Sequence, residues 1–135
     1  MSIASSKYKI IPPKKILPIY VANVQRSGKI GFTIASGKHF GVDTSKTIAL
    51  MVNAEDVSDD SIYGVFLSDG QKDQGYRITK NGEYHSIDAK EFFEEIGIDY
   101  SKPLSFSISE FVETDGTKML KFTRRETKTS LNGQK

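Results

Sequence analysis

The chain has 135 residues, no cysteine and a formal net charge of +2. This length suits one ordinary domain that buries a core without a metal or cross-links, and the lack of cysteine excludes disulfides, thiolate metal sites and thiol catalysis. A charge so close to neutral argues against a polyanion binder that works by bulk charge alone.

The amino-terminal end has no pattern of a secretory signal. The apolar stretch 16–24 is interrupted by Pro18 and Asn23 and is too short to span a bilayer. We therefore expect a cytoplasmic protein that makes no membrane contact.

Charge is distributed unevenly along the chain. No acidic residue precedes Asp43, and the carboxylates gather between Glu55 and Asp73 and in the segment 88–99. Both ends are basic, through Lys7, Lys9, Lys14 and Lys15 at one end and Arg124, Arg125, Lys128 and Lys135 at the other. Basic ends can hold a phosphate backbone, or they can be ordinary solvated tails, and the sequence leaves both options open.

The first half of the chain is predicted to be extended. Residues 1–17 contain two prolines in succession and no hydrophobic period, which predicts a mobile arm. Alternating apolar residues predict strands at 19–26 and 29–34. The segment 47–53 is apolar on both faces, which predicts a central strand, and a further strand is predicted at 61–67. Ser27-Gly28 predicts a hairpin turn between the first two strands, and 35–41 interrupts the extended pattern as one helical turn.

The second half contains the only clearly signalled helix. Asp88 and Glu91 have the spacing of a capping box, and Gly97 is placed to end the helix. Its apolar stripe consists of Ala89, Phe92, Phe93 and Ile96. Strands are predicted at 76–79, 84–87, 104–111 and 118–124, with a hairpin turn at Lys80-Asn81-Gly82-Glu83.

The two halves show the same order of elements. Gly41-Val42-Asp43 corresponds to Gly97-Ile98-Asp99, and the turn at Gly28 corresponds to the turn at Gly82. Units this small cannot each close a core, so we predict an α+β fold, mostly antiparallel β, of two fused ββαββ repeats packed as a pseudo-twofold pair. The predicted segments are a flexible basic arm at 1–17, a first repeat at 18–70, a second repeat at 71–125 and a polar tail at 126–135.

This order of elements resembles a known family. The turn Lys80-Asn81-Gly82-Glu83, a short strand, a helix that ends Glu-Glu-Ile-Gly-Ile-Asp and then paired strands are similar to the AbrB/SpoVT swapped-hairpin fold. The fused duplicate looks like the arrangement in MraZ-type proteins. The resemblance implies a DNA-binding transcription regulator or accessory protein, with duplex DNA as the favoured partner and a homo-oligomer as one option.

In that family, basic residues near the first hairpin and the helix start meet the DNA. The resemblance implies contacts from Arg26, Lys29 and Lys38 with His39 in the first repeat, from Arg77, Lys80 and Lys90 in the second, and from the arm. Arg124 and Arg125 complete the predicted nucleic-acid-binding set because of the basic carboxyl-terminal end. The first repeat has fewer acids, so we expect it to make the main contacts.

A different arrangement of the same strands remains open. Residues 47–99 also give four strands followed by a helix, the order of Pur-alpha, Whirly-type and coactivator single-strand binders. In those proteins bases stack on aromatic side chains of a curved sheet. The candidates are Tyr63, Phe66, Tyr76, Arg77, Tyr84 and His85, each of which could instead be core. A protein-interaction or assembly module without nucleic-acid binding is the third option.

Little in the sequence indicates catalysis. His39 and His85 are the only histidines, and neither has a nearby cluster of carboxylates that would form a metal site or a catalytic triad. The glycines lack the spacing of a phosphate-binding loop. We therefore expect no enzyme activity, no catalytic residue, no metal and no cofactor.

Overall fold

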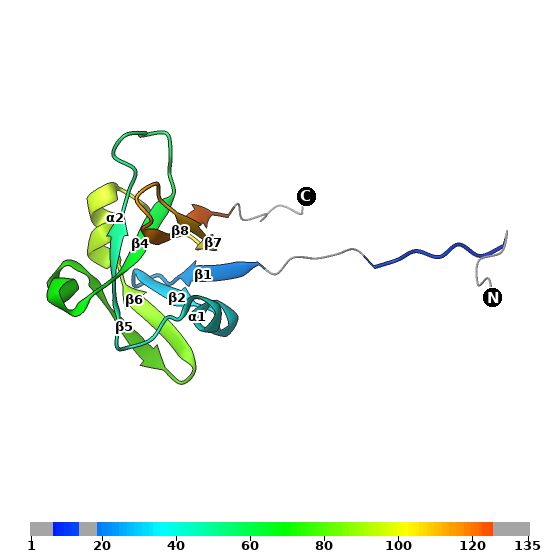
Figure 1. Cartoon of the computed structure of the whole chain (residues 1–135), viewed down its shortest axis with the longest axis horizontal. Helices are drawn as coiled ribbons and strands as arrows, with labels where there is room; N and C mark the ends of the chain where they lie inside the picture. Colours follow the sequence, from blue (N-terminus) through cyan, green and yellow to red (C-terminus); the bar gives the residue numbers. More distant parts are fainter. Residues whose placement is uncertain (1–6, 14–18, 126–135) are drawn as a thin grey trace.

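The computed structural model describes residues 7–13 and 19–125. Residues 19–125 contain eight strands that form one closed barrel, in which every neighbouring pair is antiparallel (Figure 1). The strands are β1 Tyr20–Val24, β2 Lys29–Phe32, β3 Thr47–Met51, β4 Ile62–Leu67, β5 Tyr76–Asn81, β6 Tyr84–Asp88, β7 Leu104–Val112 and β8 Lys118–Arg124. Their order around the barrel is β1-β2-β6-β5-β3-β4-β8-β7.

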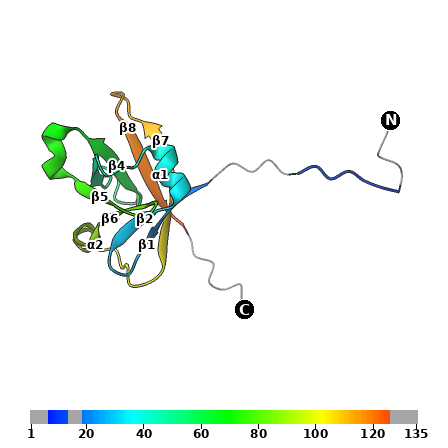
Figure 2. The ribbon, with the colours of Figure 1, turned by 90° about the horizontal axis from the view of Figure 1, so that it is seen from below.

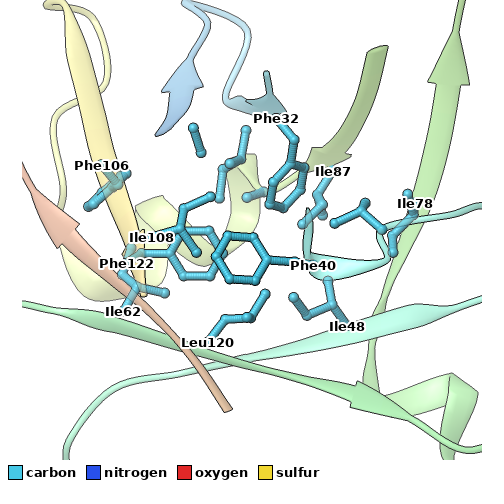
Figure 3. Close-up of a cluster of buried hydrophobic side chains, with 14 of the residues drawn as sticks. Phe32, Phe40, Ile48, Ile62, Ile78, Ile87, Phe106, Ile108, Leu120 and Phe122 are labelled. Carbon is cyan, nitrogen blue, oxygen red and sulfur yellow. The ribbon is translucent and has the colours of Figure 1, made fainter. Parts of the chain in front are cut away.

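Apolar side chains from all the strands fill the barrel, since alternate residues of a strand point to opposite faces (Figure 3). The Phe122 ring meets two other rings of this core. Its centroid lies 6.1 Å from the centroid of Phe32 and 6.3 Å from the centroid of Phe106. Burying one such side chain stabilises a fold by roughly 1.5–3 kcal/mol. The barrel interior is therefore packed with apolar side chains.

Two short helices lie on different sides of the barrel (Figures 1 and 2). α1 Ile34–Phe40 begins after Thr33, whose hydroxyl accepts a hydrogen bond from the Ser36 N–H, and ends at Gly41 with φ 70°. α2 Lys90–Ile96 buries Phe92 and Phe93 and ends at Gly97 with φ 77°. A short 3₁₀ helix, η1 Asp69–Gln74, joins β4 to β5.

The fold class expected from the sequence is wrong. The mostly antiparallel β character is present, but the strands form one closed eight-stranded barrel with two short helices and not two fused ββαββ repeats packed as a pair. Hydrophobic alternation shows which face of a strand is buried, but it does not show which strand pairs with it. Here β2 pairs with β6 and β4 with β8, so hydrogen-bonded ladders join the two halves into a single sheet.

Local features of the two halves are nevertheless alike. Asp43 and Asp99, which follow the two helix-ending glycines, each accept a hydrogen bond from the backbone N–H two residues on, at 2.7 Å and 2.9 Å. The boundary predicted between residues 70 and 71 falls inside η1. Residues 1–6 and 14–17 of the predicted arm, residue 18 of the predicted first repeat and the whole predicted tail, 126–135, lie outside the described residues.

The start of the second helix differs from the prediction. The residue before its first turn is Ala89, and no side chain caps the helix. Asp88 instead ends β6, and its carboxylate accepts a 3.3 Å hydrogen bond from the Lys90 N–H. The capping box fails because Asp88 is held in the sheet opposite Lys29. Within the described part of the chain, no helix has the length and apolar character needed to cross a membrane.

Candidate nucleic-acid interface

A polar groove crosses the outer face of four neighbouring strands. Its floor is a row of short side chains, in which Asn23 on β1 pairs with Gly31 on β2, Gly31 with Ser86 on β6, and Ser86 with Thr79 on β5. Successive residues of a strand point to opposite faces of the sheet. Each of these residues has a neighbour in its strand that is buried in the core, so its own side points outward. The groove has a volume of about 630 Å³. We call it the polar groove.

The rim of the polar groove carries positive charge. Lys29 lies where β2 begins and Lys80 near the end of β5, and both side chains are exposed. Gln25, Asn81 and Tyr84 also line the rim, and none of the described residues that line the groove is acidic. An anionic chain placed here would meet hydrogen-bond donors on the floor and ammonium groups at the edges.

Two further hollows adjoin the polar groove, and Lys80 lines all three. The first lies between α1 and the β5–β6 hairpin and is lined by Lys38 and Glu83, among others. The second is lined by Arg77 and Asp73, together with Lys46 and Lys72. Lys29, Lys38, Arg77 and Lys80 therefore border one continuous surface, which we call the basic face.

Lys46 has a structural role at the border of this surface. Its ammonium group donates a 2.7 Å hydrogen bond to the Gly41 carbonyl and lies 4.8 Å from the centroid of the Phe66 ring. Cations are favoured at the carboxyl end of a helix, where carbonyl groups lack partners. Nearby, the hydroxyl and the N–H of Ser45 hydrogen-bond to Asp43 and hold the pKa of that carboxyl below its usual value.

His85 connects the basic face to α1. It pairs with Phe32 and with Lys80 on the neighbouring strands and is half-buried. A side-chain carbon placed on Gly37 would lie 3.5 Å from the His85 Nδ1 atom, so the helix packs closely against this ring. Lys38 is the next residue of α1, and it lines the same hollow as Lys80.

The structure brings together four of the nine predicted contact residues. Lys29, Lys38, Arg77 and Lys80 form the basic face. Arg26 instead lies in the β1–β2 turn, and Lys90 is the first residue of α2, which packs against that turn. A side-chain carbon on Gly28 would lie 2.7 Å from the Lys90 Cβ atom, which shows how tightly this turn packs on the helix.

The other three predicted residues lie elsewhere. The His39 ring stacks on Tyr20, with centroids 4.0 Å apart and planes at 10°. Arg124 and Arg125 line a separate hollow that also includes the carboxylates of Asp60 and Asp99. These three residues therefore do not join the basic face.

Sequence reasoning missed the floor of the polar groove. Asn23, Thr79 and Ser86 occupy outward positions in strands that the alternation predicts, and such positions are usually taken as merely solvated. The signal that could have found them is the pairing of β2 with β6, because it alone places the two hairpins side by side.

The aromatic residues proposed as stacking platforms are dispersed. Phe66 and Tyr76 are partly buried against the core, and Tyr63 lines a cleft formed by other strands. Tyr84 is 59% exposed and borders the polar groove. A single exposed ring at this surface fits backbone contact better than a row of stacked bases.

Comparison of the chain with protein-family models, curated proteins and solved structures finds no match. The resemblance to AbrB/SpoVT and MraZ-type proteins therefore stays a prediction. The functional proposal therefore depends on the chemistry of the basic face.

Proposed function

We propose that this chain is a non-enzymatic nucleic-acid-binding protein that contacts DNA through the basic face. The observation that carries the proposal is that Lys29 and Lys80 line a groove whose floor is polar and uncharged. Lys38 and Arg77 line the two hollows that share Lys80 with it, so both halves of the chain contribute cations. Lysine and arginine side chains neutralise phosphates, and short hydroxyl and amide side chains hydrogen-bond to phosphate oxygens.

Duplex DNA is the favoured ligand in this proposal. The basic face offers several cations and one exposed aromatic ring, Tyr84, so it supplies phosphate contacts more readily than stacking. A regulatory or accessory role, which the family resemblance implies, and a cytoplasmic location both belong to the proposal. Lysines of the arm would add phosphate contacts that position the protein without reading sequence.

Single-stranded DNA is the second candidate, and the exposure of Tyr84 beside the groove favours it. Removing the ring separates the two ligands. A Tyr84→Ser change should weaken single-strand binding about tenfold or more if a base stacks there, since one stacked base contributes roughly 1–3 kcal/mol. Duplex binding should change little.

Fluorescence anisotropy with a labelled duplex and the matching single strand tests the proposal. We expect binding at low salt and a linear fall of log K with log salt concentration, with a slope of about −0.9 for each phosphate contact on a duplex. Absence of binding to either ligand at low salt would overturn the proposal and favour an interaction module.

A further inference from the structure

Part of the edge of β7 lacks a neighbouring strand among the described residues. β1 pairs with β7 from Leu104 to Ile108, and β8 pairs with the other edge from Phe106 to Val112. Among the strand pairs of residues 19–125, the backbone of Ser109–Val112 is therefore paired on the β8 side only. Open backbone N–H and C=O groups of this kind are a template for another extended segment.

A partly apolar cleft lies beside this edge. Ser109 and Phe111 line it together with Met51, Tyr63 and Met119, and its volume is about 480 Å³. The Tyr63 and Phe111 rings meet edge to face, with centroids 5.6 Å apart. Glu55 and Glu113 add negative charge to the lining, Lys121 adds a positive charge, and Glu110 is exposed on β7.

The amino-terminal segment has the complementary chemistry. Tyr8, Ile10 and Ile11 are 63%, 57% and 82% exposed, which leaves three large apolar side chains in water. Lys7 and Lys9 alternate with Tyr8 and Ile10, so an extended segment has one apolar face and one basic face. Pro12 and Pro13 lack the N–H that a ladder requires, so a strand formed here would end at Ile11.

We propose that residues 7–10 of one copy pair as an extra antiparallel strand with Ser109–Val112 of a second copy. One register satisfies both faces of the segment. With Lys9 opposite Glu110, Tyr8 lies opposite Phe111 and Ile10 opposite Ser109, both on the cleft side. The lysine then faces a carboxylate, and the tyrosine faces an aromatic ring.

A second copy fits this edge better than the segment of the same copy. In the proposed register, the residue after Ile10 would lie opposite Ile108, where Tyr20 of the receiving chain already pairs. Within one chain, residues 11–19, which include three prolines, would have to loop between adjacent ladder positions. A segment from another copy needs no such loop, and the exchange can close as a symmetric dimer.

Cross-linking between copies tests the pairing directly, and the absence of native cysteine makes introduced thiols specific. The full-length Ile10→Cys and Ser109→Cys variants are mixed under mild oxidation. Opposite Cβ atoms in an antiparallel pair lie about 4.5–5.5 Å apart, close to disulfide range. We expect the mixed dimer in at least tenfold higher yield than when Ser109→Cys is replaced in the mixture by Val57→Cys, a control at a 97% exposed site. Equal yields would overturn the proposal.

Charge exchange provides an independent readout by analytical ultracentrifugation. Lys9→Glu alone should weaken dimerisation about two- to fivefold, and Glu110→Lys in the same chain should restore it. Tyr8→Ser with Ile10→Ser should weaken it more than tenfold. Tyr8, Lys9 and Ile10 lie on the segment outside the barrel, and Glu110 is exposed. None of these changes alters a core residue. A monomer at every concentration, or no restoration by the double change, would contradict the pairing.

Discussion

Gly31 on β2 lies directly opposite Ser86 on β6, and the two residues form the middle of the floor of the polar groove. A side-chain carbon on Gly31 would meet its nearest atoms, the Asn23 carbonyl oxygen and the Gln25 Nε2 atom, at 3.6 Å, which is ordinary contact. The groove is therefore open above this glycine, and the backbone does not require glycine there.

This geometry makes Gly31 a site at which the groove can be filled without unfolding the barrel. Gly31→Phe should fold and should weaken nucleic-acid binding at least tenfold, because the ring would occupy the space above Ser86. Gly31→Ala is the matched control and should bind like the unchanged chain. Equal binding by the Phe variant in anisotropy titrations would place the ligand elsewhere.

Ser36 fixes α1 to the barrel through hydrogen bonds to Val21. The Ser36 hydroxyl accepts from the Val21 N–H at 2.8 Å and donates to the Val21 carbonyl at 3.0 Å, and the side chain is fully buried. Ser36→Ala should lower the free energy of unfolding by about 1–3 kcal/mol, because the Val21 N–H loses its partner away from water. Urea unfolding measures this change.

Ser101→Ala is the control for that experiment. Ser101 is exposed, and its hydroxyl bonds only the neighbouring Asp99 carboxylate at 2.6 Å. We expect a change within about 0.5 kcal/mol. Similar losses for the two variants would contradict a special role of Ser36.

The two hairpin glycines should respond differently to the same substitution. Gly28 and Gly82 both have positive φ, at 91° and 65°. A side-chain carbon on Gly28 would lie 2.8 Å from the Lys90 Cα atom, whereas one on Gly82 meets nothing within 4 Å. Gly82→Ala should therefore cost about 1–2 kcal/mol, the cost of the left-handed conformation alone.

Gly28→Ala should cost more, about 2–4 kcal/mol, since the β1–β2 turn must also move away from α2. Thermal or urea unfolding of both variants measures the difference. Equal losses would show that the contact with Lys90 relaxes freely.

The Tyr63 hydroxyl donates a short hydrogen bond to the Asp59 carboxylate. This bond raises the pKa of Tyr63 from 10.0 to about 12 and, with the N–H of Ser61, holds the pKa of Asp59 well below its usual range. The stabilisation linked to Tyr63 is complete below pH 10 and is lost as the pH rises through about 12. The contribution of Asp59 is present above its unfolded pKa of 3.8 and is lost as the pH falls towards its folded pKa.

Tyrosinate absorbance tests this pair. In Asp59→Asn, the pKa of Tyr63 should fall back towards its ordinary value, because the hydrogen bond to a carboxylate is the largest cause of the shift. The Tyr63→Phe variant identifies which transition belongs to this residue. An unchanged transition in Asp59→Asn would contradict the bond.

The sequence predicted the local structure well and the pairing poorly. All eight strands lie where the sequence predicts them, with ends shifted by at most two residues, and Gly97 ends α2 as predicted. The sequence predicts only a single helical turn near residues 34–40, because Thr33 alone is a weak signal for the start of a helix. In the structure the Thr33 hydroxyl accepts a hydrogen bond from the N–H of Ser36, which is buried. Asp88 has a helix-capping residue type, yet strand pairing with Lys29 holds it in β6.

The candidate site was predicted in part for the same reason. Lys29 and Lys80 flank hairpin turns and were identified from their positions in the sequence. Their approach across one groove depends on the β2–β6 ladder, which joins residues more than fifty positions apart. Arg124 and Arg125 were included for their charge, and the barrel places them in a different hollow.

The most direct test of DNA binding by the basic face is the salt dependence of duplex binding after charge reversal. Lys29→Glu with Lys80→Glu should weaken binding strongly and reduce the magnitude of the salt slope by about 2, one unit for each lost phosphate contact. Lys118→Glu, an exposed change on β8 at the opposite side of the barrel from β6, should leave the slope nearly unchanged. Equal affinities and slopes for these two variants would contradict the proposed interface.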